Sequence, residues 1–200
     1  VTTTRTSSAT AATAPPSSLD TLVLGVVVDL PEPAAGELRA HREAIGDPQV
    51  DLIPAHVTLL PPTAVAPEEL RRIERHLATL ATRSHPFEVS LDGAETFRPI
   101  SQVVYVRVTD GAEHLDALQR TVRRGPLERD LVYPFHPHVT VAHKLDDAVL
   151  DVAMTRLARY RASFTVDSFL LYEQDSTGLW HPRRRFGFGR PERGGRTRSG

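Results

Sequence analysis

The triplet His-Val-Thr occurs twice in the sequence, at residues 56–58 and 138–140, and an apolar residue follows each copy. Both copies also follow a proline-containing segment, Ile53-Pro54-Ala55 in the first case and Phe135-His136-Pro137 in the second. A motif that recurs with matched flanks predicts an internal duplication, in which each half of the chain supplies one copy.

Each triplet lies in a short run of β-branched and apolar residues, which is typical of a strand. Side chains alternate between the two faces of a strand, so His56 and Thr58 share one face, as do His138 and Thr140. The intervening valines point the other way, into a core. Each predicted strand therefore presents one imidazole and one hydroxyl side by side.

The remaining pattern predicts a mixed chain. The strand with the first triplet is expected to end at Pro61-Pro62, and the second to cover 138–142. Apolar residues at helical spacing predict four helices. Because strict β-α-β alternation is missing, we expect an α+β fold with largely antiparallel sheet rather than a doubly wound parallel one. Further strands are predicted at 21–28, 87–91, 102–108, 164–172 and 179–186 (the last two as a hairpin), and helices at 31–46, 70–80, 115–122 and 149–160.

Composition separates the two ends of the chain from its middle. Residues 1–18 are rich in Thr, Ser, Ala and Pro and are predicted to be a disordered tail. Residues 190–200 are predicted to be a disordered basic tail, and residues 19–189 one folded domain. The whole chain has a net charge of −1, but residues 181–200 hold seven Arg and one Glu, +6, which leaves −7 on the rest. A basic tail can attract polyanions, although a solvated tail is the simpler interpretation.

Several classes of protein are excluded. The chain has no cysteine, so it is not a disulfide scaffold, a thiol enzyme or a Cys-ligated metal protein. No apolar run approaches the ~18–20 residues of a membrane span, and the N-terminal residues lack the apolar core of a secretory signal. We therefore expect a cytoplasmic protein with no membrane partner. We also expect a monomer, because the sequence shows no heptad pattern or large apolar stripe.

The paired triplets suit in-line displacement at phosphorus, if the two strands meet across a pseudo-twofold cleft. One neutral imidazole can take a proton from an attacking hydroxyl or water, while the other, protonated, gives a proton to the leaving oxygen. Histidine fits both roles because its unperturbed pKa is ~6.5. A threonine hydroxyl can donate to a non-bridging phosphate oxygen without adding charge. This chemistry requires no metal.

At these residues the sequence resembles the 2H phosphoesterase superfamily, specifically its bacterial 2′-5′ RNA ligase-like, or RNA 2′,3′-cyclic phosphodiesterase, branch. That family is defined by two His-x-Thr/Ser-x motifs, which residues 54–59 and 135–141 match. Residues 164–173, followed by Trp180 and Arg185-Phe186, resemble the family's closing hairpin, and the resemblance covers roughly residues 19–189.

The resemblance implies a bilobal fold, with two lobes related by a pseudo-twofold axis, helices flanking the sheets and an active cleft between them. It implies cleavage of the 2′,3′-cyclic phosphate ends of RNA or nucleotides, usually to a 2′-phosphate, with no metal or cofactor. The reverse reaction would join RNA ends through a 2′-5′ linkage. By this resemblance His56 and His138 are catalytic, and Thr58 and Thr140 bind the phosphate.

The sequence departs from the pattern at His143, where ligase-related members often have an arginine. His143 is a candidate for a further phosphate-binding residue, and Lys144 could supply the charge instead; a solvated strand end is the competing interpretation. His136, His138 and His143 are a weak candidate for a metal cluster, because strand alternation predicts that His143 faces away from His138.

Other residues allow two interpretations each. Tyr105 and Trp180 could stack on a base, although simple packing in the hairpin is the stronger prediction for Trp180. The run 183–185 could send one arginine to the cleft or form a charged edge strand. The histidines of the predicted helices, His41, His76 and His114, are expected to be exposed.

Two other functions remain open. The fold could bind phosphorylated RNA ends without turnover, which the basic C-terminus would favour. It could also hydrolyse a phosphodiester other than RNA, such as a cyclic nucleotide linked to another metabolite.

Overall fold

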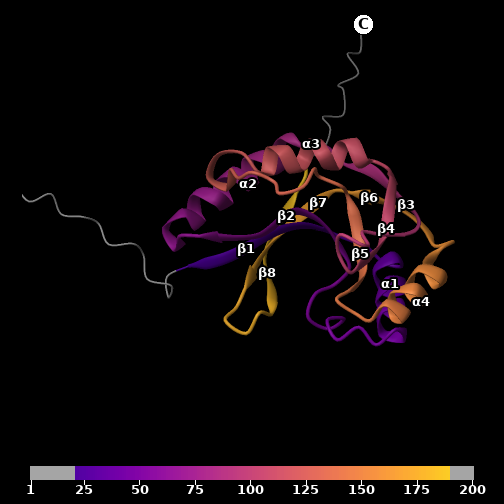
Figure 1. The fold of residues 1–200 in the computed structure, drawn as a ribbon. Helices are drawn as coiled ribbons and strands as arrows, with labels where there is room; N and C mark the ends of the chain where they lie inside the picture. The colour runs from indigo at the N-terminus through magenta and orange to yellow at the C-terminus, as the bar shows by residue number, and fades with distance from the viewer. Residues whose placement is uncertain (1–20, 190–200) are drawn as a thin grey trace, which may run out of the picture.

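The computed structural model describes residues 21–189 (Figure 1). The two predicted tails, 1–18 and 190–200, lie outside the described residues. The chain forms four α-helices, α1 (Ala34–Ala44), α2 (Leu70–Arg83), α3 (Ala112–Val122) and α4 (Asp147–Leu157). Its strands are β1 (Leu22–Asp29), β2 (His56–Val65), β3 (Phe87–Thr96), β4 (Val103–Asp110), β5 (His138–His143), β6 (Arg161–Val166), β7 (Ser168–Gln174) and β8 (Trp180–Gly187).

All eight strands belong to one sheet with the order β6-β3-β4-β5-β2-β1-β7-β8, and every neighbouring pair is antiparallel. The predicted α+β class with antiparallel sheet is therefore confirmed. The two lobes are the two halves of this sheet, β1, β2, β7 and β8 on one side and β3, β4, β5 and β6 on the other.

The order of the elements repeats across the middle of the sheet. The run β1-α1-β2-α2-β3 corresponds to β4-α3-β5-α4-β7, so β2 and β5 lie at the centre with β1 and β4 outside them. In both runs the third strand crosses to the other half, β3 beside β4 and β7 beside β1. The two-lobed, pseudo-twofold arrangement expected from the repeated motif is present.

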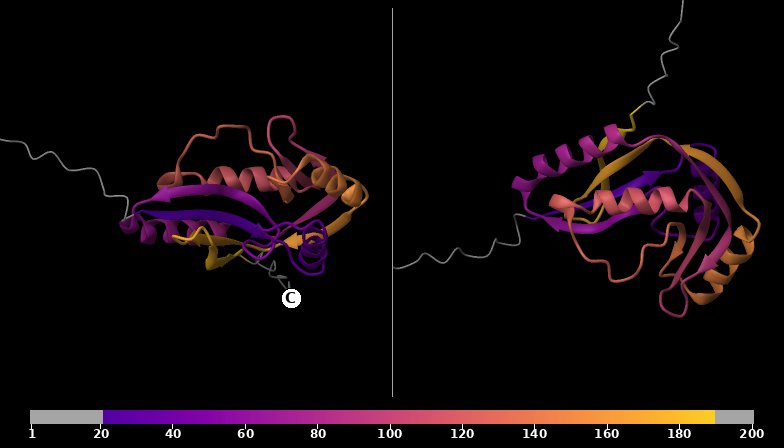
Figure 2. Two further views of the ribbon diagram at one scale, coloured as in Figure 1. Left: turned by 60° about the horizontal axis from the view of Figure 1, so that its bottom comes forward. Right: turned by 90° about the horizontal axis from the view of Figure 1, so that it is seen from above.

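The sheet is strongly curled, as Figures 1 and 2 show. The sequence predicted one strand over 164–172, but the structure breaks it into β6 and β7, separated only by Asp167. Because β6 lies at one edge of the sheet and β7 lies next to the other edge, a single linking residue requires the sheet to bend round on itself. The half-barrel shape follows from this short connection.

The prolines of β2 lie inside the strand rather than at its end. The strand was expected to end at Pro61-Pro62, but it continues to Val65. A proline cannot donate a ladder hydrogen bond, so it fits only at a strand edge or a bulge. Beyond the start of β2 the pairing is with β1 alone, and it is irregular between Leu24 and Val27, so the prolines are accommodated there.

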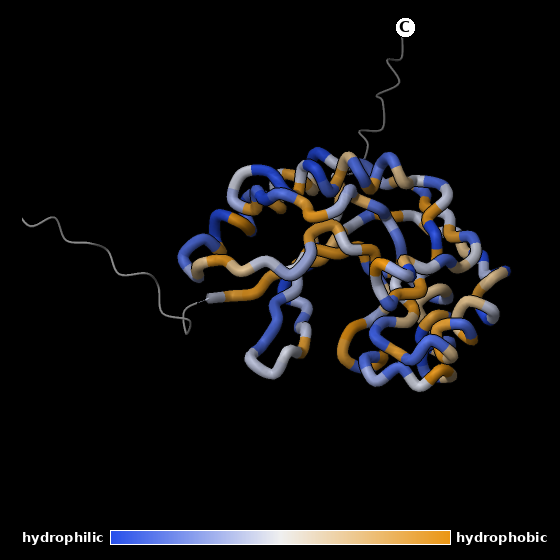
Figure 3. Tube along the Cα trace, viewed as in Figure 1, coloured by the Kyte–Doolittle hydropathy of each residue, from blue (hydrophilic) through white to orange (hydrophobic). Residues whose placement is uncertain are grey.

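The helices cover one side of the sheet and build the core there. Helices α2 and α3 pack on β8 and β2, while α1 and α4 pack on β3, β4 and β5. Val57 and Val139 of the central strands belong to this core, which is why the neighbouring His and Thr side chains face the other side. Figure 3 shows hydrophobic residues along the central strands and alternation along the helices. Each helix supplies fully buried leucines: Leu38 (α1), Leu77 (α2), Leu115 (α3), and Leu150 and Leu157 (α4).

None of the helices within residues 21–189 combines the length and the apolar character that crossing a membrane requires.

Candidate active site

The two predicted motif strands meet at the centre of the sheet. Backbone pairing joins β2 and β5 through Val57 and Val139, which are directly opposite one another. Continuing this antiparallel register by one residue on each side places His56 across from Thr140 and Thr58 across from His138. Directly opposite residues have Cβ atoms about 4.5–5.5 Å apart, so the two imidazoles and two hydroxyls form one compact group.

Both motif strands carry the same irregularity one residue after the threonine. In β2 the partners of β1 jump from Thr58 to Leu60, and in β5 the partners of β4 jump from Thr140 to Ala142. The extra residue is Leu59 in one strand and Val141 in the other. Such a β-bulge shifts the following side chains to the opposite face.

The bulge in β5 corrects the expectation for His143. Simple alternation predicted that His143 faces away from His138, but His143 lines the same hollow as His138 and Thr140. The corresponding residue after the bulge in β2, Pro61, lines it too. The sequence therefore identified His143 as a candidate despite a wrong argument about its direction. Within residues 21–189 no three His, Asp or Glu side chains are grouped so as to hold a metal ion.

The two imidazoles are held by matching backbone contacts. Nδ1 of His56 lies 2.8 Å from the carbonyl oxygen of Pro54, and Nδ1 of His138 lies 2.6 Å from that of His136. A carbonyl oxygen only accepts, so each Nδ1 must be the protonated donor. In the neutral ring this leaves Nε2 with its lone pair, ready to accept a proton. The residue two positions before each histidine thus sets its tautomer.

The environment lowers the pKa of both histidines. Burial, which disfavours the charged ring, is the largest cause for each. The hydrogen bond to the carbonyl opposes this shift, while the positive charge of Arg42 lowers the pKa of His56 further and the neighbouring His136 and His56 rings lower that of His138. The pKa of His143 is also lowered, first by burial and then by Lys144.

The hollow beside these residues has a volume of about 540 Å³. Its polar lining includes four of the five predicted site residues, Thr58, His138, Thr140 and His143. The fifth, His56, is the cross-strand neighbour of Thr140. Apolar and aromatic side chains from the β3–β4 loop and from residues 131–135 form the rest of the wall. These two segments project from the same side of the molecule in both views of Figure 2.

An aromatic wall stands next to His138. The Phe97 ring stacks on Tyr105 at 4.3 Å between centroids and meets His138 edge-on at 5.0 Å. Tyr105 is buried, donates a hydrogen bond to Glu95 and has its pKa raised to about 12, mainly by burial. The Tyr105 ring is thus enclosed by Phe97, His136 and His138. Phe97 was not predicted from the sequence, because its position between two strands carries no periodic signal.

A buried ion pair supports the segment that leads into His56. Arg42 and Asp47 are each 6% exposed, and Nε of Arg42 lies 2.7 Å from the carboxylate of Asp47. The two Nη groups of Arg42 donate to the carbonyls of Ile53 (2.7 Å) and Gln49 (2.9 Å). Arg42 therefore fixes both ends of the loop that ends at Pro54, the acceptor for His56. Only one arginine of α1 does this, which no sequence pattern distinguishes.

The run 183–185 sends its arginines to carboxylates. Arg183 pairs with Glu74 and Glu173, and Arg184 with Glu74. Arg185 lies on the face of the catalytic histidines, where it binds Asp29, the cross-strand neighbour of His56, at 2.5 Å.

Trp180 packs in the hairpin, as predicted. It is half-buried against a small cluster formed by Val27, Leu170 and Tyr172. A Cβ atom on Gly25 would approach the Trp180 ring to 3.2 Å, so the missing side chain makes room for the indole.

Comparisons with known proteins agree with this geometry. The sequence model of the 2′-5′ RNA ligase superfamily matches residues 30–178. A protein of Bacillus cytotoxicus, provisionally named a phosphoesterase, is 32% identical over 146 residues, which cover 72% of this chain and 84% of the relative. A protein of Bacillus licheniformis with the same provisional name is 34% identical over 136 residues, covering 67% of this chain and 80% of the relative.

Solved structures share the fold. The crystal structure of E. coli LigT in its apo form superposes with a TM-score of 0.59 at 24% identity, and covers 85% of this chain and 99% of LigT. The complex of LigT with 3′-AMP gives a TM-score of 0.57 at 22% identity with the same coverage.

Proposed function

The chain belongs to the 2′-5′ RNA ligase superfamily of 2H phosphoesterases, and on this premise we propose that it hydrolyses 2′,3′-cyclic phosphate ends of RNA or nucleotides. The proposed catalysts are His56 and His138, acting as an acid–base pair without a metal ion. The observation that carries the proposal is the pairing of β2 and β5, which presents two imidazoles with available Nε2 atoms and two hydroxyls on one face.

The proposed reaction is an in-line displacement at the cyclic phosphate. One imidazole accepts a proton from water as the oxygen of that water forms a bond to phosphorus. The bond from phosphorus to a ribose oxygen, O3′ where the product is a 2′-phosphate, breaks on the opposite side. The other imidazole, protonated, gives its proton to this leaving oxygen, so the pair ends with its protons exchanged and the charge balanced.

The phosphate itself supplies the protonated histidine. Burial keeps both imidazoles neutral, but a negative phosphate next to a histidine favours its charged form. Binding of substrate thus raises the pKa of the imidazole nearest to it. The hydroxyls of Thr58 and Thr140 are placed to donate to the non-bridging oxygens, whose charge grows in the transition state.

The wall of the hollow suits a nucleotide end. Its apolar surface accepts a flat, weakly polar group, and its polar residues lie together at the floor of the sheet. The E. coli neighbour has been crystallised with 3′-AMP and with phosphate, ligands of the same chemical kind.

Hydrolysis of a nucleoside 2′,3′-cyclic phosphate in EDTA tests the proposal. We expect the wild type to turn over and His56→Ala and His138→Ala each to lose roughly 10²–10⁴-fold in kcat. His41→Ala on α1 is the matched control and should retain activity. Turnover that persists in either catalytic variant, or that EDTA abolishes, would refute the two-histidine mechanism. Tight binding of the cyclic end with no product would favour the binding module instead.

A further inference from the structure

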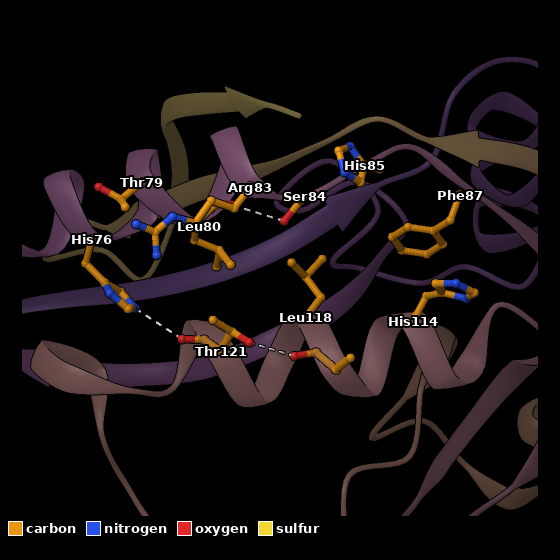
Figure 4. Close-up of a pocket in the computed structure, with 11 residues that line it drawn as sticks. His76, Thr79, Leu80, Arg83, Ser84, His85, Phe87, His114, Leu118 and Thr121 are labelled. Carbon is orange, nitrogen blue, oxygen red and sulfur yellow. Dashed lines mark hydrogen bonds between the residues drawn. The ribbon is translucent and has the colours of Figure 1, made fainter. Parts of the chain in front are cut away.

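A second hollow lies between α2 and α3, on the side of the sheet that the helices cover (Figure 4). Its volume is about 400 Å³. The catalytic histidines face the other side of the sheet, so this groove is separate from the site described above. It is preformed, because Nε2 of His76 on α2 lies 3.2 Å from the carbonyls of both Thr121 and Val122 at the end of α3. His76 is thus half-buried rather than exposed as predicted.

One end of the groove is an aromatic platform. The rings of Phe87 and His114 are stacked, with centroids 5.1 Å apart and planes 16° from parallel. His114 is exposed on α3, so Phe87 covers one face of its ring while the other is open to a further planar group. Leu80 and Leu118 form an apolar floor next to this pair, as Figure 4 shows.

The rest of the lining is cationic. In Figure 4 the guanidinium of Arg83 lies on the His76 side of Leu80, away from the stacked rings. Arg83 makes no ion pair with any described residue, and no Asp or Glu among residues 21–189 lines the groove. His85 adds a third imidazole to the rim. A ligand with a flat ring and a negative charge matches this arrangement.

The basic C-terminal segment starts at the same rim. The backbone N–H of Gly189 donates to the carbonyl of Ala81, at 3.1 Å, in the last turn of α2. A Cβ atom at Gly189 would come within 2.5 Å of the Thr82 carbonyl, so a glycine is needed for this close approach. Residues 190–200 follow, with four Arg and one Glu. Their net charge of +3 is therefore tethered beside Arg83.

We propose that this groove and the basic residues after it bind single-stranded RNA, with one base stacked on His114 and neighbouring phosphates beside Arg83 and the C-terminal arginines. Stacking on exposed rings combined with a basic backbone contact is the usual mode for unpaired strands, whose bases are accessible. An acidic peptide would match the charge but leave the His114 ring without a planar partner. The binding does not depend on the proposed phosphodiesterase activity.

Fluorescence anisotropy tests the proposal, with the full-length chain and a labelled ten-nucleotide RNA that ends in a plain 3′-hydroxyl. His114→Ala should weaken binding roughly fivefold or more, because base stacking contributes about that much or more. Arg83→Ala and a chain ending at Gly189 should also weaken it, and the truncation should reduce the dependence of affinity on salt. His114→Ala should leave that salt dependence unchanged. Arg71→Ala, an exposed arginine elsewhere on α2, is the matched control.

Three results would overturn the proposal. The first is an affinity within twofold of wild type for the Arg83→Ala/His114→Ala variant. The second is tighter binding after truncation, which would mean that the chain's own end occupies the groove. The third is equal affinity for an acidic peptide or for duplex RNA. Because the RNA carries no cyclic phosphate and His56→Ala/His138→Ala is expected to bind it like wild type, failure here is distinguishable from failure of the proposed hydrolysis.

Discussion

Val57 and Val139 face each other where β2 meets β5, and this single pair sets the register of the whole candidate site. Both are buried, at 1% and 0% exposure, so the pair is locked by the core on the helix side. Each imidazole then faces the hydroxyl of the other motif rather than its own, with His56 across from Thr140. A phosphate held at this junction would contact both halves of the duplication at once.

Replacing Thr58 or Thr140 by Val tests this crossed arrangement. Valine keeps the branched shape but removes the hydroxyl, and a hydrogen bond to a charged group contributes about 1.5–3 kcal/mol. We expect kcat/KM for a nucleoside 2′,3′-cyclic phosphate to fall roughly 10- to 150-fold in each variant. Thr→Ser at the same positions keeps the donor and should retain most activity. Equal activity of the Val and Ser variants would contradict a role for the hydroxyls.

The pH profile follows from the lowered histidine pKa values. The free enzyme is competent when one imidazole is neutral and the other protonated. Because the pKa of both His56 and His138 lies below 6.5, this form is most populated on the acid side of pH 6.5. We therefore expect a bell-shaped kcat/KM profile centred below pH 6.5. The kcat profile should be centred at higher pH, since bound phosphate favours the protonated ring.

Steady-state kinetics from about pH 4.5 to 9 would measure both profiles. A kcat/KM maximum above about pH 7 would show that burial does not control these histidines.

The buried ion pair of Arg42 and Asp47 allows a test that separates positioning from folding. Arg42→Met leaves a buried carboxylate unpaired, which costs about 3–5 kcal/mol in the free energy of unfolding. Arg42→Met/Asp47→Asn removes that charge and should recover part of the loss. Arg42 lowers the pKa of His56, so both variants should shift the kcat/KM profile towards higher pH.

Urea unfolding and the pH profile measure these two effects independently. The control is Arg39→Met, which removes a half-exposed pair with Glu43 on the same helix and should cost less than about 1 kcal/mol. If Arg42→Met proved as mild as Arg39→Met and left the pH profile in place, Arg42 would not position His56.

Much of the fold could be predicted from the sequence because it follows from local pattern. The 3.6-residue period located α2 from Leu70, Ile73, Leu77 and Leu80, and the motif strands followed from their alternation. What failed depends on pairing between distant segments. The break at Asp167 is one example, since nothing local distinguishes one long strand from two that join opposite ends of a curled sheet.

The site shows the same division. The repeated triplet was enough to bring His56, Thr58, His138 and Thr140 together, because their faces are set by strand alternation alone. The carbonyls that hold the imidazoles, the ring of Phe97 and the clamp of Arg42 come from loops and from a helix face. Their positions depend on loop length and tertiary packing, which carry no periodic signal.

His143 depends on the bulge at Val141, and its replacement tests whether the bulge has a functional consequence. The bulge turns His143 onto the wall of the hollow next to Thr140, where a ring N–H can donate to a phosphate oxygen. We expect His143→Ala to raise KM for the cyclic nucleotide about two- to tenfold, the equivalent of one net hydrogen bond, with a smaller effect on kcat. His143→Gln keeps a donor and should restore part of the affinity. Lys144→Ala is the control for the neighbouring charge: a larger effect there than at His143 would assign the phosphate contact to the lysine, and no effect at either position would make the bulge a feature of the sheet alone.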